Sequence, residues 1–280
     1  MSREPFGARL ASVVAARGPL CVGIDPHPGL LAEWGLSADA AGLERFALGT
    51  VAALGSEIAV LKPQSAFFEA YGSAGIAVLE RTIREANAAG ALVLLDVKRG
   101  DIGSTMDAYA AAYLADDAPL AADAITVSPY LGFGSLNPAL DLAAKTGRGV
   151  FVLALTSNPE GAAIQRATAP DGESAAQSVV RQAAERNVGT APLGSVGIVI
   201  GATVERLELD ISHLNGPILA PGFGAQGGTV ADLRTIFGAS VPAVLPSSSR
   251  DVLRHGPDLR LLRDAALRVR DVVKSELSWV

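Results

Sequence analysis

Residues 91–101 read A-L-V-L-L-D-V-K-R-G-D, an apolar run that ends in alternating charges. The run 91–95 is typical of a buried strand, and Asp96, Lys98 and Asp101 follow it where the strand opens into a loop. Successive side chains of a strand point to opposite faces, so Asp96 and Lys98 share one face. Opposite charges placed together in a buried setting indicate either catalytic chemistry or a structural ion pair, and this stretch alone leaves both interpretations open.

The rest of the chain repeats a strand-then-helix pattern. Short β-branched or apolar runs alternate with alanine-rich segments of helical period, which is typical of successive βα units. The predicted strands are residues 20–24, 59–62, 91–96, 124–127, 149–155, 196–200, 217–220 and 243–245. The predicted helices are residues 42–54, 74–89, 105–115, 136–145, 175–186, 204–212, 230–237 and 259–276, with a further helix before the first strand.

Eight such units in about 250 residues match a (β/α)8 TIM barrel of the α/β class, with an extra N-terminal helix. A doubly wound open sheet is the alternative fold. We find no Pro/Ser-rich linker, so residues 1–280 are expected to form a single barrel domain. The polar segment 162–174 contains Gly and Pro and is expected to form a surface excursion after the fifth strand.

Composition narrows the classes of partner. The formal net charge is −6 and Lys and Arg are scattered, which disfavours a nucleic-acid or anionic-membrane partner and favours a small-molecule substrate. The single cysteine, Cys21, lies in the apolar run L-C-V-G-I, so no internal disulfide can form and a reducing compartment is expected. The sequence M-S-R-E-P-F-G-A-R-L lacks the apolar core of a signal peptide, and no apolar run reaches membrane-helix length. We therefore expect a cytoplasmic protein.

Charged residues also end the first two predicted strands. Asp25 follows the first and Lys62 ends the second, and each alone is compatible with an ordinary turn before proline. In a barrel, however, the C-terminal strand ends meet at one mouth, where Asp25, Lys62 and Asp96 would form an alternating array. At an effective dielectric constant near 20, opposite charges about 4 Å apart attract by about 4 kcal/mol. Such an array is preorganised for a charged substrate.

The last two units carry a candidate phosphate site. Residues 220–228 read A-P-G-F-G-A-Q-G-G, whose glycines let backbone N–H groups approach an anion at a helix start, with Gln226 adding an amide. The run P-S-S-S-R places Arg250 at a second helix start, after the eighth strand, where a guanidinium can hold a phosphate. A glycine-rich connector and a surface arginine are the alternative interpretation. Their register with strands seven and eight favours phosphate.

These residues resemble the orotidine 5'-phosphate decarboxylase family, specifically its longer bacterial branch. The resemblance covers nearly the whole barrel and rests on V-G-I-D-P-H (22–27), L-K-P-Q-S-A-F-F-E (61–69), D-V-K-R-G-D-I-G-S-T (96–105), T-S-N-P (156–159) and P-G-F-G-A-Q-G-G (221–228). The D-x-K-x-x-D motif carries most of the specificity. The likeness implies conversion of orotidine 5'-phosphate to UMP and CO2 in de novo pyrimidine biosynthesis, without a metal or organic cofactor.

The same likeness implies a role for each matching residue. Asp25 and Lys62 would bind ribose hydroxyls, Asp96 would face the reacting carboxylate, and Lys98 would protonate C6. Ser157 would bind the pyrimidine, and Gln226 and Arg250 the phosphate. Asp101, Ile102 and Thr105 would reach the neighbouring subunit's site, which implies a homodimer with shared active sites. One departure is Ser249, because many members have Gly before the phosphate-binding arginine.

Other activities remain open. A Mg²⁺-dependent sugar-phosphate decarboxylase or aldolase of the same barrel family would use Asp25, Asp96 and Asp101 as metal ligands, although a nearby lysine competes with a cation for them. A class I aldolase would need Lys62 or Lys98 as a neutral amine, which adjacent carboxylates oppose. A non-catalytic phosphosugar-binding barrel would not need Lys98. The three histidines show no ligand spacing and are expected at turns or in solvent.

Overall fold

The chain is described by a computed structural model that covers residues 3–204, 207–224, 227–277 and 279. Within these residues, eight parallel strands follow one another in chain order and close into a barrel, with β8 paired to β1. The strands are β1 (Cys21–Ile24), β2 (Val60–Pro63), β3 (Leu92–Arg99), β4 (Ala124–Val127), β5 (Gly149–Leu155), β6 (Val196–Ile200), β7 (Ile218–Pro221) and β8 (Val244–Ser248). The predicted TIM barrel is therefore confirmed.

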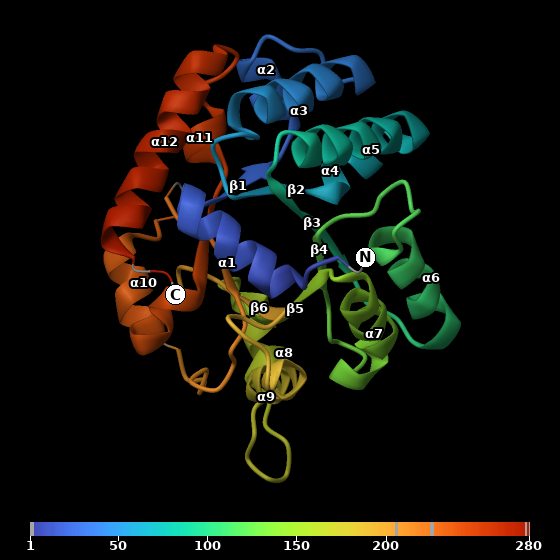
Figure 1. Ribbon diagram of the computed structural model, residues 1–280, viewed down its shortest axis with the longest axis vertical. Coiled ribbons are helices and arrows are strands. Elements are labelled where there is room, and N and C mark those ends of the chain that lie inside the picture. The colour runs from blue at the N-terminus through green and yellow to red at the C-terminus, as the bar shows by residue number, and fades with distance from the viewer. Residues whose placement is uncertain (1–2, 205–206, 225–226, 278, 280) are drawn as a thin grey trace.

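Helices surround the barrel (Figure 1). They are α1 (Phe6–Arg17), α2 (Pro28–Glu33), α3 (Ala40–Leu54), α4 (Ser65–Glu69), α5 (Gly72–Ala88), α6 (Gly103–Leu114), α7 (Asn137–Thr146), α8 (Ala162–Gln165), α9 (Ala175–Asn187), α10 (Val230–Phe237), α11 (Arg250–Leu253) and α12 (Leu259–Glu276). Short 3-10 turns lie at η1 (Phe133–Leu136), η2 (Pro159–Gly161) and η3 (Gly238–Ala243).

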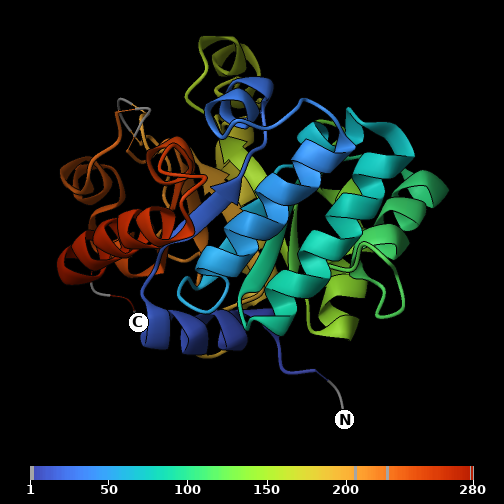
Figure 2. The same cartoon turned by 90° about the horizontal axis from the view of Figure 1, so that it is seen from above.

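The extra N-terminal helix is present and closes one end of the barrel. Figure 1 shows α1 lying across the opening, and Figure 2 shows it along the edge of the strands. Arg9 of α1 donates to Asp123, the residue before β4, across 2.5 Å, and both side chains are largely buried. This ion pair ties the helix to the end of the barrel opposite the strand C-termini.

One predicted helix is wrong. Residues 204–212 were expected to be helical, but the described residues of this segment form turns and bends. Leu207, Leu209 and Ile211 pack against the core while Glu208 and Asp210 are exposed. Apolar residues therefore turn inward at every second position, a period that suits an extended chain rather than a helix. The Asp210 carboxylate also accepts from the Ser212 amide, which stabilises a local turn.

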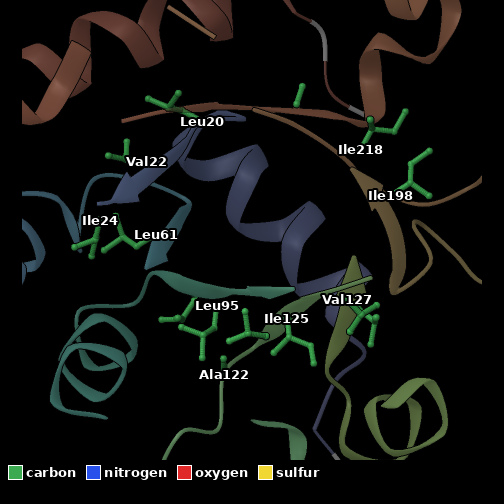
Figure 3. Packing of buried hydrophobic residues seen from close by; sticks show 14 of the residues in the cluster. Leu20, Val22, Ile24, Leu61, Leu95, Ala122, Ile125, Val127, Ile198 and Ile218 are labelled. Carbon is green, nitrogen blue, oxygen red and sulfur yellow. The ribbon is translucent and has the colours of Figure 1, made fainter. Parts of the chain in front are cut away.

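The buried apolar residues form two cores, because the side chains of each strand alternate between the outside and the inside of the barrel. Side chains such as Val22, Leu61 and Leu95 point outward and pack under the helices, as Figure 3 shows. Inside the barrel, Leu94 and Phe151 pack with neighbours from the other strands and with α1. Because the side-chain period of a strand is two, the inward positions continue upward to residues near the strand C-termini. There the interior changes from apolar to polar.

Residues 162–174 form the predicted surface excursion. The segment carries the short α8, is mostly exposed, and closes on itself through a bridge between Thr168 and Ser174. It extends beyond α9 at the lower edge of Figure 1. Among the described helices, we find none with the length and apolar character needed to span a membrane.

Candidate active site

The charged stretch lies at the C-terminal end of β3, and its backbone is irregular there. The strand was expected to end at Asp96 but continues to Arg99. Its pairing with β4 shifts between Leu95 and Arg99, and Lys98 has a φ of 48°. A non-glycine residue in this left-handed region is strained by about 1–2 kcal/mol. Lys98 and Asp96 lie on the same face of the strand, as a period of two predicts, and their side chains meet there.

Asp96 lies between two ammonium groups. Lys98 Nζ donates to Oδ1 across 2.5 Å, and Lys62 Nζ donates to Oδ2 across 3.0 Å. Burial alone would raise the pKa of the Asp96 carboxyl, but Lys62 and Lys98, together with hydrogen bonds from Lys98 and Thr126, hold that pKa well below its usual range. Asp96 is therefore a carboxylate at neutral pH.

Lys62 extends the array toward β1. Its ammonium lies 4.0 Å from Oδ1 of Asp25 and is largely buried. Burial would lower the pKa of Lys62, but the carboxylates of Asp96 and Asp25 outweigh that effect and raise the pKa above its usual value. Asp25 Oδ1 lacks a hydrogen-bond partner within the described residues. The predicted alternation of acid and base across three neighbouring strand ends is therefore present.

These groups line a cavity of about 290 Å³ at the mouth of the barrel. The lining residues are Asp25, His27, Lys62, Gln64, Phe67, Asp96, Pro221, Gly222, Phe223, Ser247, Ser249 and Arg250. The cavity thus joins the carboxylate–ammonium array of strands β1 to β3 with the loops that follow β7 and β8. Its size is near the lower end of the range for small-molecule sites, and its charged groups suit an ionic substrate.

The other half of the cavity is built from the loops after β7 and β8, where the sequence predicts a phosphate site. Arg250 starts α11 and lines the cavity beside Ser249. In the loop after β7, the amides of Gly224, Gly227 and Gly228 donate to carbonyls of the same loop, so these three N–H groups are already paired. Gly224 has a φ of 84°, and a Cβ there would meet Asp251 at 2.0 Å. Gln226 lies outside the described residues.

Five further residues with predicted roles do not line this cavity. Lys98 is one of them, although its ammonium donates to Asp96, which does line it. Ser157 lies in the exposed loop after β5, against Gly201 at the end of β6. The side chain of Asp101 accepts from the Ile102 amide, and Ile102 is 62% exposed. Thr105 is exposed in the first turn of α6. None of the last three residues therefore lines the cavity of its own barrel.

Five residues of the site were not predicted, among them Ser247, which lines the cavity from β8. His27 was expected at a turn or in solvent; it does cap α2 by accepting from the Leu30 amide, but it also lines the cavity. Gln64 and Phe67 line the cavity from the loop after β2, and Gln64 Oε1 is buried with no partner among the described residues. Thr126 is buried beside Asp96. The sequence alone could have indicated Thr126, because it is the one polar residue of the strand A-I-T-V.

A larger cavity, of about 490 Å³, lies between the loop after β4 and helices α8 and α9. Its described lining contains Ser, Gln, Tyr and apolar residues but no charged side chain, so it fits a strongly anionic substrate poorly. Across the described part of the chain, no three His, Cys, Asp or Glu side chains gather in a metal-binding arrangement. The charged side chains that line the smaller cavity include the carboxylates of Asp25 and Asp96, the Lys62 ammonium and the Arg250 guanidinium.

Comparison with known proteins gives a consistent family. Residues 18–259 match the family described as orotidine 5'-phosphate decarboxylase / HUMPS. An orotidine 5'-phosphate decarboxylase of Salinispora tropica is 63% identical over 266 residues, covering 95% of this chain and 96% of the relative. The enzyme of the same name from Streptomyces coelicolor is 61% identical over 265 residues and covers 95% of both chains.

Solved structures agree in fold. A protein from Streptomyces avermitilis, 59% identical, superimposes with a TM-score of 0.94 and covers 99% of this chain and 97% of its own. The OMP decarboxylase of Leishmania donovani is 31% identical, with a TM-score of 0.76 and 99% coverage of both chains.

Proposed function

The chain belongs to the orotidine 5'-phosphate decarboxylase family and removes CO2 from orotidine 5'-phosphate in pyrimidine biosynthesis, and on this basis we propose that the cluster around Asp96 is its catalytic centre. The observation that carries the proposal is the sharing of one buried carboxylate between Lys62 and Lys98, at 3.0 and 2.5 Å. In this role the protein is a carbon–carbon lyase.

Lys98 is the proposed acid. When the bond from C6 to the carboxylate breaks, its electron pair stays on C6 as a vinyl carbanion that no neighbouring carbonyl can delocalise. Stabilisation must then be electrostatic, from a positive group beside the developing charge. The Lys98 ammonium supplies that charge and transfers its proton to C6. No metal or organic cofactor enters this sequence of steps.

Asp96 would contribute through repulsion. Its carboxylate would lie against the carboxylate of the substrate, a like-charge contact that is relieved as CO2 leaves. The depressed pKa of Asp96 supports this role, because only the ionised form repels. A few kcal/mol of repulsion cannot supply the about 8–23 kcal/mol by which enzymes typically lower barriers. Most of the effect must come from other interactions.

Much of the remaining decrease in the barrier would come from the binding of substrate groups that lie far from C6. Arg250, with Gln226, would hold the phosphate, and that binding energy would keep the strained arrangement at C6 in place. Asp25 and Lys62 would bind the ribose hydroxyls. The buried Asp25 Oδ1 supports this, because it has no hydrogen-bond partner among the described residues. Ser157 would bind the pyrimidine from the loop after β5. We also place the enzyme in the cytoplasm, because its substrate is an anion that does not cross membranes.

The active sites would be shared between two subunits. Asp101, Ile102 and Thr105 would complete the site of a partner in a two-fold dimer. Their position outside their own cavity supports this, as does the exposure of apolar side chains on neighbouring loops, where Tyr130 is 74% and Leu131 50% exposed. Exposed apolar side chains that gather on one face are typical of an interface.

Three alternative functions fit this cluster less well. A Mg²⁺-dependent relative would need Asp25, Asp96 and Asp101 to converge, but Lys62 lies between the first two and Asp101 is not among the residues that line the cavity. A class I aldolase would need a neutral lysine, whereas the carboxylates raise the pKa of Lys62. A non-catalytic phosphosugar-binding barrel would leave the Lys98–Asp96 pair without a role.

Purified protein incubated with orotidine 5'-phosphate in EDTA tests the proposal. We expect the orotate absorbance to fall at the same rate with and without the chelator, because the Lys98 ammonium provides the positive charge. Loss of turnover in EDTA with recovery on adding Mg²⁺ would favour the metal-dependent alternative. Borohydride added during turnover should trap no covalent adduct, and a trapped Schiff base would favour the aldolase.

A further inference from the structure

The irregular pairing of β3 with β4 leaves one residue of β4 opposite three of β3. Leu95 pairs with Ile125 and Arg99 pairs with Val127, so residues 96–98 face Thr126 alone. A bulge of this kind disrupts the regular backbone ladder and re-aims a side chain. The backbone N–H and C=O groups that lose their ladder partners at the bulge must then form hydrogen bonds with other groups.

The Thr126 hydroxyl forms a hydrogen bond with each of two groups at the bulge. It accepts from the Lys98 backbone amide at 3.0 Å and donates to Oδ1 of Asp96 at 2.7 Å. The same Oδ1 accepts from Lys98 Nζ. Thr126 is 1% exposed, so water cannot replace its hydroxyl without rearrangement. One buried side chain therefore contacts the carboxylate and the backbone of the lysine that pairs with it.

The conformation of Lys98 needs such support. Its φ of 48° is unfavourable for a residue with a Cβ, and it persists only where the surroundings fix it. After the bulge, the Ser128 amide donates to the Arg99 carbonyl at 2.8 Å, and the Arg99 guanidinium pairs with Glu69. These contacts hold the chain beyond Lys98. The Thr126 hydroxyl holds Lys98 itself.

We propose that Thr126 is a positioning residue, which sets the Lys98 ammonium and the Asp96 carboxylate against the reacting carbon through its hydroxyl. The inference rests on the proposed function of Lys98 and Asp96. Without the hydroxyl, the Lys98 amide loses its acceptor and Asp96 Oδ1 loses a donor, so the bulge can relax and the ammonium can move. The phosphate-binding Arg250 lies on a different strand end, so substrate binding should change little.

Replacement of the hydroxyl by a methyl group tests this directly. For Thr126→Val we expect kcat to fall about 10- to 100-fold, the range expected for a lost hydrogen bond to a charged group. KM and the binding of UMP should stay within about threefold, and Thr126→Ser should recover most of kcat. Hydrogen exchange should be faster at the Lys98 amide in the valine variant and not in the serine variant.

Thr50→Val is the matched control. Thr50 is also fully buried, but its hydroxyl donates to the Phe46 carbonyl within α3, away from the site. This variant should lose similar stability and keep the wild-type kcat. If Thr126→Val does not fold, Thr126→Cys carries the test, because a thiol fills similar space but is a weak donor.

A near-normal kcat in folded Thr126→Val or Thr126→Cys would overturn the inference, as would an equal loss in Thr126→Ser. Neither result would touch the proposed function, which stands or falls with Lys98→Ala. If Lys98→Ala remains active, the proposed function fails first. A parallel fall of kcat and of UMP binding in Thr126→Val would mean that the residue only supports the barrel.

Discussion

The Lys98 ammonium donates to Oδ1 of Asp96 across 2.5 Å, although one residue separates the two in β3 and Lys98 has a φ of 48°. A regular strand would place both side chains on one face but about two residue rises apart. In this chain the pair lies within a bulge opposite Thr126. The contact between the two side chains is therefore made at a local irregularity of the backbone.

Loss of the Asp96 charge should destabilise the protein in a pH-dependent way. Asp96→Asn leaves Lys62 and Lys98 without their shared counter-ion, and we expect a loss of about 3 kcal/mol in the free energy of unfolding at pH 7. Asp141→Asn, in an exposed pair with Arg186, is the control and should cost at most about 1 kcal/mol. Urea unfolding at fixed protein concentration measures both.

The sign of the pH dependence follows from the two pKa shifts. The folded-state pKa of Asp96 is depressed, so its stabilisation is present above the unfolded value of about 3.9 and is lost as the pH falls below it. The pKa of Lys62 is raised, so its stabilisation is lost only as the pH rises above about 10. The difference between wild type and Asp96→Asn should be constant from about pH 5 to 9 and shrink below about pH 4. A difference that is unchanged at pH 3.5 would contradict the assignment.

Arg250→Ala should separate phosphate binding from the rest of the site. We expect kcat/KM for orotidine 5'-phosphate to fall about 100-fold or more, because a charge-assisted contact is lost. With orotidine, which has no phosphate, the change should be small. Arg254→Ala removes an exposed arginine one turn along the chain, paired with Asp251, and should affect neither substrate. Equal losses on both substrates would make Arg250 structural.

Mixed dimers test whether Asp101 acts across the interface. Lys98→Ala and Asp101→Ala homodimers should each be nearly inactive, but a mixed dimer has one site with both defects and one with neither. Random reassortment gives half mixed dimers with half their sites intact, so about a quarter of wild-type activity should return. If mixed dimers form and stay inactive, Asp101 acts within its own chain.

The sequence predicted the regular parts of the fold well. The bounds of β4, β5, β6, α10 and α12 agree with the expected ranges, because each is a continuous run with one clear period. Short helices such as α2 and α4, with 6 and 5 residues, were missed because one or two turns carry too little periodic pattern. Residues 204–212 were mistaken for a helix because the apolar residues of this segment are spaced in a way that fits a helical period as well as a period of two.

The site was predictable where it depends on strand ends. Asp25, Lys62 and Asp96 meet because parallel strands of a barrel end at one mouth, so their positions follow from the strand assignment. Thr126 and the bulge were not predicted, since a positive φ at Lys98 arises from tertiary contacts and leaves no mark such as glycine in the sequence. The conformation of the loops places His27 and Gln64 at the cavity, and that conformation cannot be predicted from the periodicity of apolar residues.

The most direct test of the central claim is single-turnover decarboxylation by Lys98→Ala, measured beside UMP binding. Lys145→Ala, an exposed lysine at the end of α7, is the control and should behave as wild type. We predict that Lys98→Ala loses at least about 1,000-fold in the rate of the chemical step, because its ammonium acts in the transition state, while UMP binding stays within about tenfold. A Lys98→Ala protein that binds UMP and still turns over orotidine 5'-phosphate near the wild-type rate would contradict the claim.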